Sequence, residues 1–135
     1  MATTSARPEA PTGLAKAHRA AALLFLALAA LVQFFLAGLA AFGHESWDAH
    51  AAMGSLLGIL ALVVLILAAV GRREALPASA LLFGLMVLQT VLGAAGHDVS
   101  VLGALHPVNG LLVLAAAMLA ATGRPLRAIH GSPRT

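Results

Sequence analysis

Four long apolar runs without a charged residue dominate this sequence. They are Ala20–Gly43, His50–Gly71, Ala75–Gly96 and Val99–Gly123. Each exceeds the roughly 20 residues that cross a hydrocarbon core of about 30 Å as a helix. Leu, Ala, Val and Ile fill the runs without an alternation of period two, which favours helices over barrel strands. The sequence therefore predicts an all-α protein, an integral membrane four-helix bundle.

The charges agree with this prediction and set the limits of the membrane domain. Only 10% of the residues are charged, whereas a soluble domain has about 25%. One domain is expected over residues 20–123, with a disordered cytoplasmic tail over 1–19 and a second cytoplasmic tail over 124–135. The four helices are expected at about 20–43, 50–71, 75–96 and 102–123.

The distribution of Lys and Arg predicts the orientation of the bundle. All eight lie before the first run, between the second and third runs, or after the fourth. The other two connections, His44–Ala49 and His97–Ser100, contain none. By the positive-inside rule the basic segments and both termini are cytoplasmic. The net charge of +3 follows from this bias, and no nucleic-acid partner is expected.

A short polar pattern occurs twice, 56 residues apart. In each copy a glutamine inside one run is followed 17 residues later by a histidine near the start of the next, and a glycine comes four residues after that histidine. The copies are Gln33, His50 and Gly54, and Gln89, His106 and Gly110. Two antiparallel helix pairs that repeat in one orientation predict a pseudo-twofold axis along the membrane normal.

The repeated histidines suggest a haem site. A twofold axis places the second and fourth runs across the bundle centre, so we expect His50 and His106 to face each other at matched depth. Two imidazoles can ligate both faces of a haem iron, and bundle interiors hold such sites. Gly54 and Gly110 share a helix face with these histidines and leave room for a flat macrocycle.

The carboxamide side chains inside the runs have two interpretations. Gln33, Gln89 and Asn109 can form hydrogen bonds between helices, as intramembrane polar residues usually do. Alternatively, they can donate to haem propionates or to an axial imidazole. The sequence leaves both interpretations open.

Two other functions compete with haem binding. The chain has no cysteine, which excludes thiolate sites, iron–sulfur clusters and covalent haem attachment. Non-covalent haem b is therefore the expected cofactor. A copper or zinc site could instead use His44, His50, His97 and His106, because imidazole suits both metals. In the third interpretation the protein is a structural or accessory subunit without a cofactor, and glycine, glutamine and histidine serve helix packing.

The pattern also resembles one four-helix half of the haem A synthase family. The residues that carry this resemblance are Gln89-x-x-Leu92-Gly93 followed by Leu105-His106, and Trp47-Asp48-x-His50. Each half of that family places haem-ligating histidines near the outer ends of its second and fourth helices, so the resemblance implies that His50 and His106 are ligands. The chain is similar to small uncharacterised four-helix bacterial membrane proteins as well.

The differences from that family limit what the resemblance implies. This chain has half the helices and lacks the loop cysteines of many members, so it implies the haem-binding scaffold and one haem per chain rather than the oxidation of haem A synthesis. We expect electron transfer or haem handling by a multi-pass protein of the bacterial cytoplasmic membrane. The expected partners are the lipid bilayer and either a second copy of the chain or a larger membrane redox complex.

Overall fold

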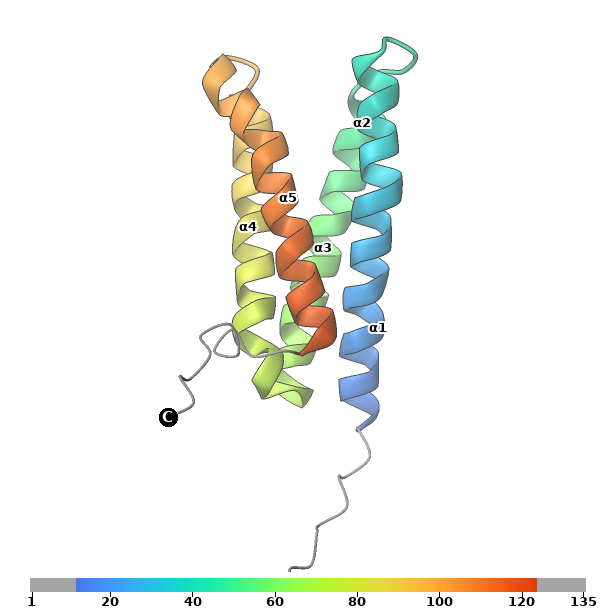
Figure 1. Ribbon diagram of the computed structural model, residues 1–135, viewed down its shortest axis with the longest axis vertical. Coiled ribbons are helices and arrows are strands. Elements are labelled where there is room, and N and C mark those ends of the chain that lie inside the picture. The colour runs from blue at the N-terminus through green and yellow to red at the C-terminus, as the bar shows by residue number, and fades with distance from the viewer. Residues whose placement is uncertain (1–11, 124–135) are drawn as a thin grey trace, which may run out of the picture.

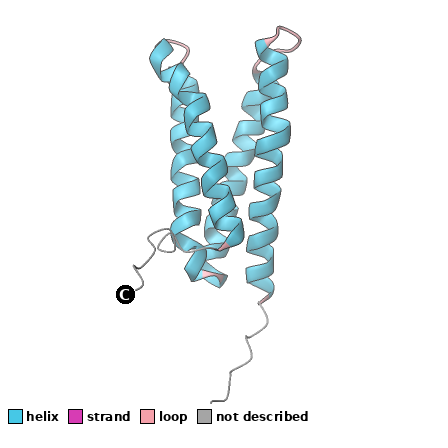
Figure 2. Cartoon of the chain, in the orientation of Figure 1, coloured by secondary structure: helices cyan, strands magenta, loops and turns pink. Residues whose placement is uncertain are grey.

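The computed structural model describes residues 12–123, which form an antiparallel helical bundle (Figure 1). The elements in chain order are α1 (Gly13–Ala27), the π-helix η1 (Leu28–Gln33), α2 (Phe34–Ala41), α3 (Asp48–Gly71), the 3-10 turn η2 (Arg73–Ala75), α4 (Leu76–Ala95) and α5 (Ser100–Thr122). These residues contain no strand (Figure 2). The elements α1, η1 and α2 are continuous, so the described residues contain four helices long and apolar enough to cross a membrane. The predicted all-α fold with four apolar helices is confirmed.

The predicted start of the first helix is wrong. Helix α1 begins at Gly13 rather than at Ala20, so residues 13–19, which we assigned to a disordered tail, are helical. The Thr12 hydroxyl accepts a hydrogen bond of 3.3 Å from the Ala15 backbone N–H, and such an N-cap satisfies one of the free donors of the first turn. The rest of the expected tails, 1–11 and 124–135, lies outside the described residues.

The four helices form a square in which each contacts two neighbours. Helix α1 packs against α3 and α5, and α4 packs against the same two helices. Helices α3 and α5 are therefore diagonal partners. The α1–α3 and α4–α5 pairs diverge toward one end of the bundle (Figure 1). We call this end, with connections 42–47 and 96–99, the histidine end, and the opposite end, with Arg72 and Arg73, the arginine end.

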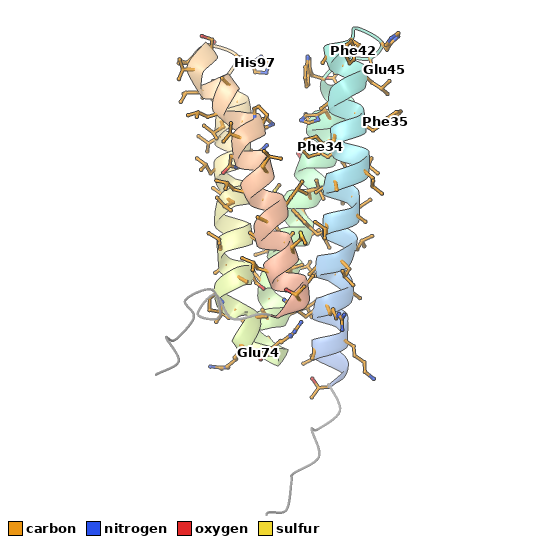
Figure 3. The ribbon with its side chains drawn as sticks, viewed as in Figure 1. Phe34, Phe35, Phe42, Glu45, Glu74 and His97 are labelled. Carbon is orange, nitrogen blue, oxygen red and sulfur yellow. The ribbon has the colours of Figure 1, made fainter. Side chains whose placement is uncertain are left out.

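Small side chains fill most of the core. Its fully buried members include Ala22, Ala61, Ala117 and Ala120, all with no exposed surface. Small residues let helix backbones approach closely, which drives helix association in lipid. Many large apolar side chains point outward, as Phe35 does at 63% exposure (Figure 3). This inside-out distribution fits a lipid environment.

Helices α4 and α5 approach each other closely at the histidine end. A Cβ atom added to Gly96 would lie 2.6 Å from the Cα atom of Gly103. Real Cβ atoms do not come so close to backbone, so only glycine fits at position 96. This contact holds the two helices together on either side of the short connection 96–99.

We therefore expect Gly96→Ala to destabilise the protein by about 1–3 kcal/mol, the usual effect of overpacking. Thermal unfolding in detergent, followed by circular dichroism, measures the loss. Gly84→Ala is the matched control, because a Cβ atom there meets nothing within 4 Å. Equal melting temperatures for the two variants would contradict the close approach.

A buried polar network joins three segments at the arginine end. His18 of α1 is fully buried, and its Nε2 atom lies 3.0 Å from the Ser79 hydroxyl of α4. That hydroxyl donates to the Ala75 carbonyl at 2.9 Å, and an Arg72 N–H lies 3.3 Å from His18 Nδ1. Arg72 also pairs with Glu74 at 3.0 Å. Nothing in the sequence pattern indicated this role for His18.

Removal of the Ser79 hydroxyl should leave the buried His18 ring without one partner. We expect Ser79→Ala to lower the free energy of unfolding by about 1–3 kcal/mol, the effect of an unsatisfied buried donor. Ser55→Ala is the control, because that hydroxyl makes the same kind of bond, to the Ala51 carbonyl, at an exposed position. Chemical denaturation in mild detergent compares them, and a control loss as large as that of Ser79→Ala would refute the network's role.

Candidate histidine site

A cavity of about 580 Å³ lies between the diverging helix pairs at the histidine end. Its volume is within the range of about 300–1,000 Å³ that is typical of small-molecule sites. All six residues predicted to bind a cofactor line it: Gln33, His50, Gly54, Gln89, His106 and Gly110. The structure therefore brings both copies of the repeated pattern into one site.

The two histidines approach each other from diagonal helices. His50 lies on the first turn of α3, and His106 lies on the second turn of α5. Their ring centroids are 6.0 Å apart, and the ring planes are tilted by 59°. Both side chains are half-buried. The two residues are 56 positions apart in the chain, so the packing of the helices brings their rings together.

The hydrogen bonds of His50 determine which ring nitrogen carries the proton. Its Nδ1 atom lies 3.3 Å from the Gln33 backbone carbonyl, which can only accept, so Nδ1 is the protonated nitrogen. Nε2 then has a free lone pair and accepts from the Gln33 side-chain amide at 3.2 Å. The same amide nitrogen donates to the His50 carbonyl at 3.0 Å. Gln33 thus holds the ring at both nitrogens.

His106 has the same arrangement with Gln89. Its Nδ1 atom donates to the Gln89 backbone carbonyl at 3.1 Å, and its Nε2 atom accepts from the Gln89 amide at 3.0 Å. Asn109 adds a contact that Gln33 lacks, because its amide donates to the Gln89 side-chain oxygen at 2.6 Å and to the Leu85 carbonyl at 2.9 Å. In both copies the glutamine makes the interhelical hydrogen bonds that the sequence suggested as one interpretation.

Three glycines lie beside the glutamines and the rings, and one of them is closely packed. A Cβ atom on Gly54 would lie 3.4 Å from the Gln33 amide nitrogen, and one on Gly110 would lie 3.5 Å from that of Gln89. Gly93 is tighter, since a Cβ atom there would lie 3.2 Å from two atoms of the His106 ring. Gly93 was not among the predicted site residues, although it belongs to the pattern Gln89-x-x-Leu92-Gly93.

The other two histidines of the histidine end do not gather with this pair. His97 is exposed and lines the cavity from the α4 side (Figure 3), whereas His44 is exposed and does not line it. Within residues 12–123 no three His, Asp or Glu side chains gather closely enough to hold a metal ion. The four-histidine copper or zinc site is therefore not assembled. Trp47 instead contacts His50 edge-on, with ring centroids 5.5 Å apart.

The π-helix η1 is the backbone feature of the site that sequence reasoning missed. It ends at Gln33, directly before α2 begins. A π-helical turn holds more residues than an α-helical turn, so it rotates the following side chains, and such turns often occur at functional sites. No Pro or Gly marks it in the sequence LAALVQ, which explains why periodicity did not reveal it.

The hydrogen bonds predict opposite protonated nitrogens for the two kinds of histidine. The neutral rings of His50 and His106 should carry their proton on Nδ1. His18 should carry it on Nε2, because Arg72 only donates to its Nδ1 atom. Nitrogen-15 NMR of histidine-labelled protein, with signals assigned by His50→Ala, His106→Ala and His18→Ala, distinguishes the two forms. Nε2 protonation in the cavity pair would show that the glutamine contacts are wrong.

Comparison with known proteins adds a family match without an activity. A family model described as "Family of unknown function (DUF6220)" matches residues 33–95. This segment contains Gln33, His50 and Gln89 but ends before His106. No curated protein and no solved structure matches the chain. The similarity therefore covers part of the site and assigns it no reaction.

Proposed function

We propose that this protein is a membrane-embedded haem-binding protein, similar to a b-type cytochrome, in which His50 and His106 are the axial ligands. The observation that carries the proposal is the geometry of the two rings, whose centroids lie 6.0 Å apart across the cavity. Imidazoles that bind opposite sides of one metal through bonds of about 2 Å have ring centres about 6 Å apart. Each ring also holds its proton on Nδ1, so the lone pair of Nε2 can bind a metal once the glutamine amide turns away.

The surrounding residues fit such a cofactor. Metal-ligating histidines usually donate their second N–H to a carbonyl, which orients the ring and raises its basicity. The Gln33 and Gln89 backbone carbonyls provide this partner. Most of the cavity wall is apolar, as the flat face of a porphyrin requires. Gly54 and Gly110 have no side chain that would project into the cavity beside the histidines.

The ligand set favours electron transfer or haem handling over an enzymatic reaction. Haem supplies one-electron chemistry when it is bound. Two histidine ligands leave no open coordination position for oxygen. The side-chain amides of Gln33 and Gln89 would turn away from the ring nitrogens and become free to donate to carboxylates of the ligand.

The proposed arrangement in the membrane follows the distribution of charge. The arginine end faces the cytoplasm with both termini, and the histidine end faces the outside of a bacterial cytoplasmic membrane. The 56-residue repeat supports a pseudo-twofold relation between the helix pairs. The resemblance to a haem A synthase half rests on this residue pattern. A second copy of the chain or a membrane redox complex would exchange electrons with the site.

Purified protein that has been given haem should show a Soret band of a six-coordinate haem. We expect His50→Ala or His106→Ala to lower haem affinity by at least tenfold, because each variant removes one axial ligand. His44→Ala is the control, since that histidine is exposed and outside the cavity. Absorption titration in detergent measures all three variants.

The structural or accessory interpretation predicts a different result. In that case the wild-type protein stays colourless after haem is added, and the histidine variants change only its thermal stability. Such an outcome would exclude the haem proposal and leave the glutamine–histidine pairs as links between helices.

A further inference from the structure

We infer that the two imidazoles are unequally available to a ligand. Asn109 locks in place the glutamine whose amide occupies Nε2 of His106, whereas no residue among 12–123 locks the glutamine at His50 in this way. His50 is then the first ligand to bind haem, and His106 follows when Gln89 is released. This order of ligation rests on the proposed function. The difference between the two glutamines is a property of the protein without cofactor.

A chain of directed hydrogen bonds creates the lock. The Leu85 carbonyl only accepts, so the Asn109 amide nitrogen must face it, at 2.9 Å. The second N–H of that amide meets the Gln89 side-chain oxygen at 2.6 Å. Gln89 must therefore direct its own amide nitrogen to His106 Nε2. Asn109 is 4% exposed, so water does not compete for these bonds.

The first copy of the repeat lacks this lock. The position 56 residues before Asn109 is Met53, whose thioether has no hydrogen to donate. Accordingly, the Gln33 side-chain oxygen is buried and has no hydrogen-bond partner among residues 12–123. Burial of an unpaired carbonyl oxygen is unfavourable, and this oxygen loses no hydrogen bond when Gln33 turns away from His50.

The two movements therefore differ in free energy. A ligand at Nε2 of either histidine must displace the glutamine amide that occupies that nitrogen. Displacement of Gln89 breaks its bond to Asn109 and leaves a buried N–H of Asn109 unpaired. Displacement of Gln33 breaks its bond to the His50 carbonyl, but that carbonyl lies within α3 and keeps its helical bond. Gln33 should move more easily.

The composition of the chain makes this difference directly measurable. The sequence contains two glutamines and one asparagine, and all three lie in this site. Protein labelled with nitrogen-15 at the glutamine side-chain amides thus gives signals from the two amides in question alone. Assignment needs one variant, Gln33→Leu.

In the cofactor-free protein we expect the Gln89 amide hydrogen that is bonded to His106 Nε2 to exchange with solvent roughly two- to tenfold more slowly than the Gln33 hydrogen bonded to His50 Nε2, because release of Gln89 also leaves an Asn109 N–H unpaired. Asn109→Met should remove the difference. Met53→Asn should slow the exchange of the Gln33 amide hydrogens. This variant keeps Asn109, so it tests the lock even if the loss of Asn109 affects folding. Equal exchange of the two amides in the unaltered protein would overturn the inference.

Haem titration of single-histidine variants tests the order of ligation. His106→Ala retains His50 and should bind haem roughly two- to tenfold more tightly than His50→Ala, which retains His106. Adding Asn109→Met to His50→Ala should raise its haem affinity toward that of His106→Ala. Equal affinities, or the reverse order, would contradict the inference. If the unaltered protein does not bind haem, the proposed function and the order of ligation are both refuted. The amide-exchange measurement still decides whether Asn109 locks Gln89.

Discussion

Polar side chains inside this apolar bundle must find their partners within the protein, because lipid offers no hydrogen bonds. This constraint explains where the helices are tied together. The Gln33–His50 and Gln89–His106 contacts link α3 to the first helix and α5 to α4 at the histidine end. His18 and its partners tie α1 to α4 at the arginine end. Between these polar layers the core is almost entirely aliphatic.

The two ends differ because the helices diverge at one and converge at the other. Small core residues allow close packing in the middle and toward the arginine end, where the polar network is compact and its histidine has no exposed surface. Toward the histidine end the pairs separate (Figure 1), and the polar contacts lie along a cavity instead. Polar groups beside a cavity can exchange their partners for a ligand, whereas those enclosed by packed helices serve only stability.

Much of the architecture was predictable because lipid leaves few solutions for a long uncharged run. The four helices follow from that constraint alone, and the pairing of His50 with His106 follows from the repeat. The start at Gly13 was not predictable from hydropathy, because the uncharged run begins only after Arg19. A helix can continue past an apolar run when its N-cap is satisfied. The π-helix left no mark in composition, and the contacts of His18 depend on tertiary packing.

The repeat itself explains why the site is not symmetric. A pattern match compares residues that are equal in both copies, and so it selects Gln, His and Gly. The residues that differ between copies set the environment of each ring. Gly93 lies against His106, whereas the residue at the corresponding position of the first copy is Ala37. Trp47 contacts His50, and glycine occupies the equivalent position before His106. The two histidines are thus placed by the residues that the copies share, and the surroundings of each ring are set by the residues that differ between the copies.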